Sequence, residues 1–144
     1  MHRVVAGASP SEVPGSGAQG AVRTFALSQD APAAARHFAV SALRRWEIAD
    51  LADDVALVVT ELAANAVRHA RSGFTVILSS CPSRPDVVRV SVRDASPLPP
   101  SGVAGSPLPV APLHGLGALN AMASHWGVES LGSSGKTVWV ELRG

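Results

Sequence analysis

The sequence predicts an α+β fold: a two-layer α/β sandwich in which a mixed, mostly antiparallel sheet carries its helices on one face. Three observations support this prediction. Two segments with apolar residues at helical spacing follow each other early in the chain, at about residues 30–46 and 51–70. Short β-branched runs come after them, and a further run closes the chain. Helices and strands grouped in this way are typical of α+β domains.

Length, charge and cysteine content limit the classes of protein to which the chain can belong. Its 144 residues suffice for one domain with a single apolar core. A formal net charge of +1 gives no electrostatic footprint for nucleic acid or an acidic membrane, so neither is expected as a partner. Cys81 is the only cysteine, which fits a reducing compartment. No signal-type or membrane-spanning run is recognisable, and a cytoplasmic location is expected.

The N-terminal part predicts a tail, a strand and a helix. Residues 1–20 are rich in Gly, Ser, Pro and Ala without periodicity, which predicts a flexible tail before a domain at residues 21–144. A first strand is expected at Val22–Leu27. Asp30 is then expected to cap a helix that has Pro32 in its first turn. The core face of this helix is predicted from helical spacing at Ala35, Phe38, Ala39, Ala42, Leu43 and Trp46.

A second helix is expected at Leu51–Ala70, ended by Ser72 and Gly73. After it, β-branched runs at Phe74–Ser80 and Val87–Val92 predict an antiparallel hairpin with a turn at Cys81–Asp86. The core face of the helix is predicted at Leu51, Val55, Val58, Leu62 and Ala66.

The C-terminal part begins with a long loop. Residues 95–113 contain six prolines and no periodicity, and such loops are usually functional lids or linkers. A short helix is expected at Leu116–Trp126, followed by a turn at Gly132–Gly135 and a last strand at Thr137–Leu142. The predicted order is strand, helix, helix, hairpin, loop, helix, strand.

Polar residues interrupt the second helix at intervals of four. Glu61, Asn65 and His69 would share one stripe of an α-helix, with Arg68 beside them. One interpretation is structural: Glu61 and Arg68 form an ion pair, and Asn65 bonds to nearby backbone. The other is functional: Glu61 acts as a general base and Asn65 supplies an oxygen to Mg²⁺, which keeps several waters and shares substrate phosphates.

Three further motifs permit both a structural and a functional interpretation. His114-Gly115-Leu116-Gly117 precedes the predicted third helix, and backbone amides there would approach a phosphate unless the segment is a simple loop-to-helix junction. Asp94 follows a strand and would accept a hydrogen bond from an adenine amino group or merely cap a turn. Gly-Lys-Thr at residues 135–137 would place a hydroxyl near Asp94 or form an ordinary turn.

In their order and spacing, these four motifs resemble the GHKL (Bergerat-fold) ATPase superfamily. Three segments, Glu61–Ala70, His125–Val128 and Gly135–Leu142, are most similar to the small bacterial anti-sigma-factor serine/threonine kinases and their stand-alone actinobacterial relatives. The resemblance covers about Val22–Leu142, which is nearly everything except the tail.

The resemblance implies a nucleotide site for ATP and Mg²⁺. It gives Asn65 the metal-ligand role and Glu61 the base role toward an accepting hydroxyl, and it makes residues 95–113 the ATP lid. It also implies further nucleotide-binding residues. They are Arg68 and His69 near the phosphates, His114, Gly115, Leu116 and Gly117 in the phosphate loop, and Asp94 and Thr137 at the base.

Two positions depart from the family pattern. Leu113 stands where the family commonly has the first glycine of its phosphate loop, and Ala95-Ser96-Pro97 replaces the glycines that follow Asp94 in the wider superfamily. The first departure leaves catalytic turnover open.

The leading hypothesis is a regulatory kinase that phosphorylates a serine or threonine of an antagonist protein and thereby regulates transcription. Its expected protein partners are this antagonist, a sigma factor or both. The alternative is a nucleotide-sensing, non-catalytic module that sequesters a protein partner. A detached histidine-kinase catalytic domain ranks below both, because no dimerisation helices with a phosphorylatable histidine are recognisable. By resemblance alone, the chain is expected to form a homodimer.

Overall fold

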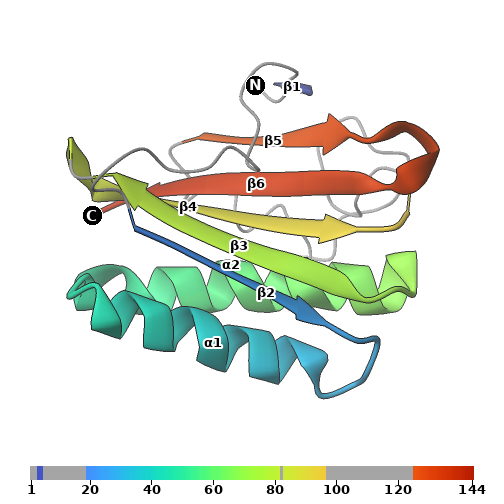
Figure 1. Cartoon of the computed structure of the whole chain (residues 1–144), viewed down its shortest axis with the longest axis horizontal. Helices are drawn as coiled ribbons and strands as arrows, with labels where there is room; N and C mark the ends of the chain where they lie inside the picture. Colours follow the sequence, from blue (N-terminus) through green and yellow to red (C-terminus); the bar gives the residue numbers. More distant parts are fainter. Residues whose placement is uncertain (1–2, 5–18, 82, 97–124) are drawn as a thin grey trace.

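The structure, a computed structural model, describes residues 3–4, 19–81, 83–96 and 125–144. Within these ranges a six-stranded sheet and two helices form two layers, with both helices on the same face (Figure 1). The strand order is β1-β5-β6-β4-β3-β2. Neighbouring strands are antiparallel except β1 and β5, which are parallel. The predicted α+β sandwich is therefore confirmed.

The predicted strands and the first helix form within about three residues of their expected ends, and the second helix reaches its expected end only with the π turn that follows it. The helices are α1 (Ala31–Arg45) and α2 (Ala52–Asn65), with 3₁₀ turns at Ala49–Leu51 and Gly132–Ser134 and a π turn at Ala66–Ala70. The strands are β1 (Arg3–Val4), β2 (Gln19–Phe25), β3 (Phe74–Cys81), β4 (Arg84–Asp94), β5 (His125–Ser130) and β6 (Lys136–Arg143).

Two strands of the sheet are absent from the predicted order: β1, which lies within the expected tail, and β5. The helix expected at Leu116–Trp126 is wrong at its end, because His125 and Trp126 begin β5. This strand pairs with β6 along its whole length. Residues 97–124, which include most of the expected lid and the start of the expected helix, lie outside the described residues. The expected tail and domain boundaries stay predictions, although Arg3–Val4 pairs with β5.

The ends of α1 are closed by local hydrogen bonds. Asp30 occupies the N-cap position, but its side chain makes no capping bond, so the predicted cap is wrong; Ser28 Oγ instead accepts the Asp30 N–H at 3.1 Å. At the other end the N–H groups of Glu47 and Ile48 donate to carbonyls of the last turn, at 3.1 and 2.9 Å. Glu47 adopts φ 59°, the left-handed conformation that this termination requires.

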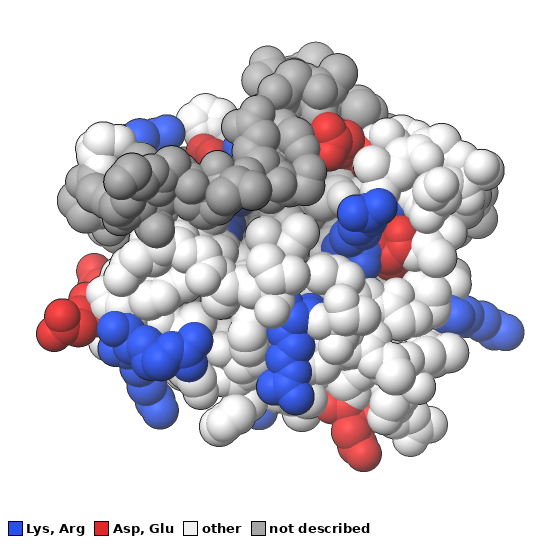
Figure 2. Space-filling view, in the orientation of Figure 1, with Lys and Arg blue, Asp and Glu red and all other residues white. Residues whose placement is uncertain are grey.

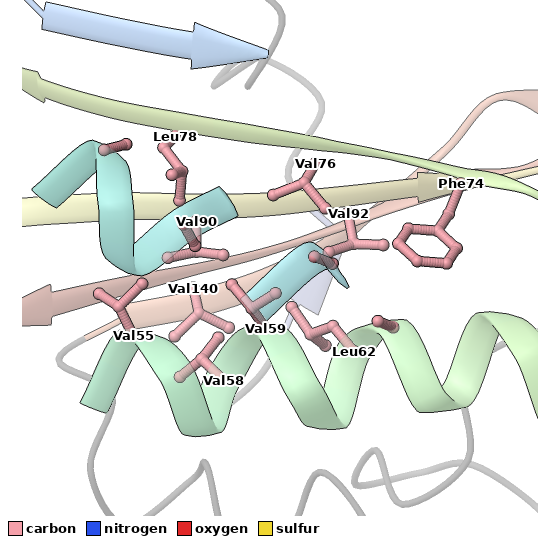
Figure 3. Packing of buried hydrophobic residues seen from close by; sticks show 14 of the residues in the cluster. Val55, Val58, Val59, Leu62, Phe74, Val76, Leu78, Val90, Val92 and Val140 are labelled. Carbon is pink, nitrogen blue, oxygen red and sulfur yellow. The ribbon is translucent and has the colours of Figure 1, made fainter. Parts of the chain in front are cut away.

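The core lies between the helices and the sheet (Figure 3). Every predicted core position of α2 is buried, and Val59 and Ala63 join them. In Figure 3, α2 side chains such as Val58 and Leu62 face strand residues such as Val90 and Val140. Removing such apolar surface from water is the main force that holds the two layers together.

The buried side chains of α1 are mostly smaller than those of α2. Ala35, Ala39 and Ala42 are fully buried, while Phe38 and Trp46 are partly buried at the edge of the core. Small side chains allow the two helices to approach closely. No helix among the described residues is long and apolar enough to cross a membrane.

The second helix does not remain α-helical to its end. Residues 66–70 form a π turn, and Arg71 follows in the left-handed conformation at φ 51°. The α-helix thus carries Glu61 and Asn65, while His69, the third residue of the expected stripe, lies in the π turn. Gly73 then turns the chain into β3, and a Cβ there would lie 2.7 Å from the Phe25 carbonyl oxygen. π turns inside helices frequently mark functional sites.

Candidate functional site

The last α turns of α2 carry two buried polar residues. Glu61 is 7% exposed and Asn65 is 6% exposed, one turn apart. The Asn65 amide Nδ2 donates to the Glu61 carbonyl oxygen at 3.2 Å. Its Oδ1 has no hydrogen-bond partner among the residues that the structure describes. Both interpretations of Asn65 are thus met in part: its nitrogen bonds to backbone, while its oxygen is left buried with capacity for a ligand.

A second polar group lies where β4 ends and β6 begins. Asp94 and Lys136 form an ion pair in which Lys136 Nζ lies 3.0 Å from each carboxylate oxygen. Their side chains are 5% and 7% exposed. The Ser96 backbone N–H donates to Asp94 Oδ1 at 2.9 Å. The carboxylate is thus ionically paired and held in one orientation.

The register of the strands and one hydrogen bond bring the helix end and this strand end together. Asp94 is paired in register with Phe74 on one side and Lys136 on the other, so the three strands meet at one end of the sheet. That end is also where α2 finishes (Figure 1). The Ala95 backbone N–H donates to Ser72 Oγ at 3.3 Å, which ties the segment after Asp94 to the helix terminus.

Glycine is required at one position of this junction. Gly135 adopts φ 128°, and a Cβ there would lie 2.0 Å from the Asp94 carbonyl oxygen. The absence of a side chain allows the two backbones to approach, which places Lys136 against Asp94. The glycine of the Gly-Lys-Thr motif therefore positions the lysine.

The remaining predicted site residues are placed differently. Arg68 is exposed within the π turn, and His69 lies in the same turn. Thr137 is buried and pairs with Arg93. Because neighbouring strand residues face opposite sides, Thr137 lies on the far side from Val138, a core residue, and so does not share the side of Asp94 and Lys136. The phosphate-loop candidates His114, Gly115, Leu116 and Gly117 lie outside the described residues.

The polar atoms present fit a magnesium ion that has few protein ligands. No group of three or more His, Cys, Asp and Glu side chains in the described ranges would hold a metal by itself. Asn65 Oδ1 is a neutral oxygen donor of the kind that Mg²⁺ accepts, and this ion commonly relies on water and phosphates for its other ligands.

The charged side chains visible in Figure 2 stand in separate groups, with basic and acidic residues interspersed.

Comparison with protein-family models identifies the family of this chain. The model for the histidine kinase-like ATPase domain matches residues 25–142. The chain belongs to this family. The match runs from the end of β2 to β6, so it includes α2, Asp94 and the Gly-Lys-Thr motif of this histidine kinase-like ATPase domain. The resemblance to the GHKL superfamily is confirmed.

A solved structure supports the same fold. The domain is similar to "The crystal structure of the RsbU and RsbW domains of Rv1364c from Mycobacterium tuberculosis", with a TM-score of 0.57 and 22% sequence identity. The similarity covers 87% of this chain and 32% of that one, so this histidine kinase-like ATPase domain spans about a third of the Mycobacterium protein. No curated protein matches the sequence significantly.

Sequence reasoning missed three residues of the candidate site. The sequence pattern favours Thr137 over Lys136, although Lys136 is the only lysine among the 12 Lys and Arg residues of the chain. The same pattern predicts Ser72 only as a helix end and Ser96 only as part of a motif. The composition offered a signal for Lys136, whereas the roles of the two serines depend on contacts made across the fold.

Proposed function

We propose that this domain binds ATP with Mg²⁺ and transfers the γ-phosphoryl group to a serine or threonine of an antagonist protein, in the manner of an anti-sigma-factor kinase. Membership of an ATPase family supports nucleotide binding, and the similarity to a structure whose title names an RsbW domain supports the regulatory class. The antagonist and a sigma factor are the protein partners of this proposal, with a homodimer as the assembled form.

Each buried polar residue has a role in the proposed reaction. Asp94 would accept a hydrogen bond from the amino group of the adenine. Asn65 Oδ1 would hold the magnesium ion, which supplies charge neutralisation at the nucleotide phosphates when bound. The hydroxyl oxygen of the partner attacks the γ-phosphorus, the bond from that phosphorus to the β–γ bridging oxygen breaks, and ADP leaves. Glu61 accepts the hydroxyl proton.

Other predicted residues complete the proposed site. Arg68 and His69 would lie near the phosphates, whereas Thr137, which faces the other side of the sheet from Asp94, is left out of the proposed base site. The loop His114–Gly117 would bind phosphate through its backbone amides.

The observation that carries the proposal is the oxygen of Asn65. A buried acceptor without a partner among the described residues costs about 1–3 kcal/mol, and a ligand that binds the oxygen would remove that cost. It lies one helical turn from a buried carboxylate, on the helix that ends beside Asp94. Binding of a metal ion and a phosphorylated ligand would explain why these polar side chains are buried here, whereas packing alone would not.

Binding is tested first, by calorimetric titration with ATP and ADP in the presence and absence of Mg²⁺. The wild-type protein is expected to bind ATP more tightly with Mg²⁺, and Asn65→Ala is expected to lose that metal dependence. If the wild-type protein binds no adenine nucleotide under either condition, the proposed function is wrong.

Transfer is tested next, with γ-labelled ATP and candidate antagonist proteins. Glu61→Gln, which keeps the shape of the side chain, is expected to lower transfer about 100-fold or more while leaving ATP affinity nearly unchanged. Asp53→Asn is the matched control, because Asp53 is an exposed acid in the first turn of the same helix. Equal transfer by the wild type and Glu61→Gln would remove Glu61 from the reaction.

A second candidate is a nucleotide-sensing module that sequesters its partner without turnover. The sequence observation that favours it is Leu113, at the position where the family commonly has the first glycine of the phosphate loop. ATP binding together with tight partner capture, but without phosphoryl transfer in the experiment above, would favour this candidate over the kinase.

A further inference from the structure

The ion pair between Lys136 and Asp94 is more deeply buried than the pairs Arg89–Glu141, His125–Glu141 and Arg143–Asp86. Its side chains are 7% and 5% exposed, and it faces the helix layer at the end of the sheet. The next pair inward on the same two strands is Val92 and Val138, both in the core. Replacing a buried ion pair with apolar residues is often neutral or stabilising, so stability alone does not explain a charged pair at this position.

The contacts of the pair leave bonding capacity on both partners. Asp94 Oδ1 receives the Ser96 N–H and Lys136, whereas Oδ2 has Lys136 as its partner among the described residues. A carboxylate has about four acceptor positions, so Oδ2 can accept another donor. Lys136 Nζ has three hydrogens, and its contact with the Ser96 carbonyl oxygen, at 3.5 Å, is too long to be strong.

An acceptor and a donor are therefore held side by side at one end of the sheet. This arrangement matches one edge of a purine. In adenine the exocyclic N6 amino group is a donor, and ring nitrogens on either side of it, such as N7, are acceptors. An aspartate alone matches the amino group, but an aspartate with a neighbouring ammonium matches two adjacent groups of the base.

We propose that Lys136 is a specificity-determining residue that reads the base together with Asp94. Asp94 Oδ2 accepts a hydrogen bond from the N6 amino group, and the Lys136 ammonium donates a hydrogen bond to the adjacent ring nitrogen. The proposal rests on the proposed binding of ATP. A lysine suits this role because its ammonium is a compact charge with rotatable donors, whereas the planar guanidinium of arginine has a fixed geometry. Every other member of the 12 Lys and Arg residues is arginine.

The backbone supports the same assignment. Gly135, at φ 128°, permits the contact between its own strand and the Asp94 carbonyl oxygen, and this contact sets Lys136 in place before a ligand arrives. Thr137, the residue that the sequence favoured at the base, faces the other side of the sheet by strand alternation. The structure thus offers Lys136, rather than Thr137, as the direct neighbour of Asp94.

The test uses calorimetry with Mg²⁺ to compare ATP with analogues in which one ring nitrogen is replaced by carbon. ATP, 7-deaza-ATP and 1-deaza-ATP, in which N7 or N1 is replaced by carbon, are titrated into the wild-type protein and into Lys136→Met. One of the two deaza analogues is expected to bind the wild type about 10-fold more weakly than ATP, because it lacks the acceptor of a hydrogen bond from a charged group. Lys136→Met is expected to bind ATP and that analogue equally well.

Arg143→Met is the matched control, because Arg143 is an exposed cation at the far end of the same strand. It is expected to discriminate between the analogues as the wild type does. Because Lys136→Met removes one partner of a buried pair and risks failing to fold, the wild-type titrations must also be decisive by themselves. If the wild type binds ATP and both analogues equally, no donor reads the ring nitrogens and the inference is wrong while the proposed function stands.

Two other outcomes also decide the matter. If Lys136→Met folds, binds ATP and still discriminates between the analogues as the wild type does, the donor is another residue and the inference is overturned. If the wild type binds none of the three nucleotides, the proposed function itself fails, and the inference fails with it.

Discussion

Three ion pairs between β4 and β6 lie in surroundings of very different polarity. The side chains of Asp94 and Lys136 are 5% and 7% exposed, those of Arg89 and Glu141 are 19% and 15% exposed, and those of Arg143 and Asp86 are 56% and 54% exposed. The middle pair is also stacked, since the Arg89 guanidinium lies 4.3 Å from the centre of the Trp139 ring. The same chemistry on the same two strands is thus found at three degrees of burial.

The comparison indicates that the contribution of an ion pair to the stability of this sheet should depend on how deeply the pair is buried. In water the attraction between two charges is largely offset by the loss of their hydration and side-chain freedom. In the interior each charge is stabilised by its partner, because burying an unpaired charge has a very high free-energy cost. Removing one partner should therefore cost most at Asp94 and Lys136 and least at Asp86 and Arg143.

The largest effect is expected from Lys136→Met. This change leaves the Asp94 carboxylate buried without its cation, and we expect the free energy of unfolding to fall by about 4 kcal/mol. Urea unfolding measures the loss. The double variant with Asp94→Leu and Lys136→Met is expected to recover most of it, because an apolar pair can replace a buried ion pair. A double variant as unstable as the single one would contradict this account of the pair.

Gly135→Ala is expected to be nearly as damaging. The added Cβ would lie 2.0 Å from the Asp94 carbonyl oxygen, so the backbone must shift, and the φ of 128° disfavours any side chain. We expect a loss of about 3 kcal/mol in urea unfolding. Gly132→Ala is a control for the conformational part, because Gly132 also has positive φ but has no atom within 4 Å of an added Cβ. Similar losses in the two variants would show that the contact with Asp94 is unimportant.

Nucleotide binding should distinguish the buried pair from the others. At an ATP concentration 100 times the dissociation constant, a ligand bound to the folded state adds about 2.7 kcal/mol of stability. Thermal unfolding with and without MgATP is expected to show this increase for the wild type and for Arg143→Met. The double variant at Asp94 and Lys136 is expected to show little of it. An equal increase in all three proteins would place the nucleotide elsewhere.

Arg89→Met should have an intermediate effect. It removes the ion pair with Glu141 and the stacking on Trp139, from which we expect a combined loss of about 1 kcal/mol in urea unfolding. Tryptophan fluorescence of the folded state should also change, because the cation beside the indole ring is lost. A loss as large as that of Lys136→Met would show that exposure does not govern these pairs.

The smallest effect is expected from Arg143→Met. The distance from Arg143 Nε to Asp86 Oδ2 is 3.6 Å, and both side chains are more than half exposed. We expect a change of about 0.3 kcal/mol, which should vanish at high salt because exposed charges are screened. A change that persists in 1 M NaCl would indicate an apolar contribution from the arginine stem instead.

Most of the layer arrangement is predictable because local patterns determine it. The apolar spacing along α2 is regular, and its predicted core residues are all buried. The hairpin of β3 and β4 follows from two β-branched runs. Strand β5 was missed because its six residues include Gly127 and only one buried position, so the strand lacks a clear alternation.

The candidate site was harder to predict because it depends on register. Asp94 and Lys136 lie 42 positions apart, and only the alignment of β4 with β6 sets them opposite each other. A shift of one residue would have placed Thr137 there instead, which is the residue the sequence favoured. The change from α to π geometry after Asn65 is equally invisible in residue spacing, so the sequence predicts one uninterrupted helix up to Ala70.

The alanines on α1 have a consequence for how this domain can diverge. Ala35, Ala39 and Ala42 have no exposed surface, so an additional methylene at any of them has to displace α1 or the core side chains around it. Substitutions that preserve the packing of α1 are confined to residues of similar size, whatever partner the domain serves. Mutational drift should therefore accumulate on the outward positions of α1, such as Arg36 and Arg44, while the inner seam stays small.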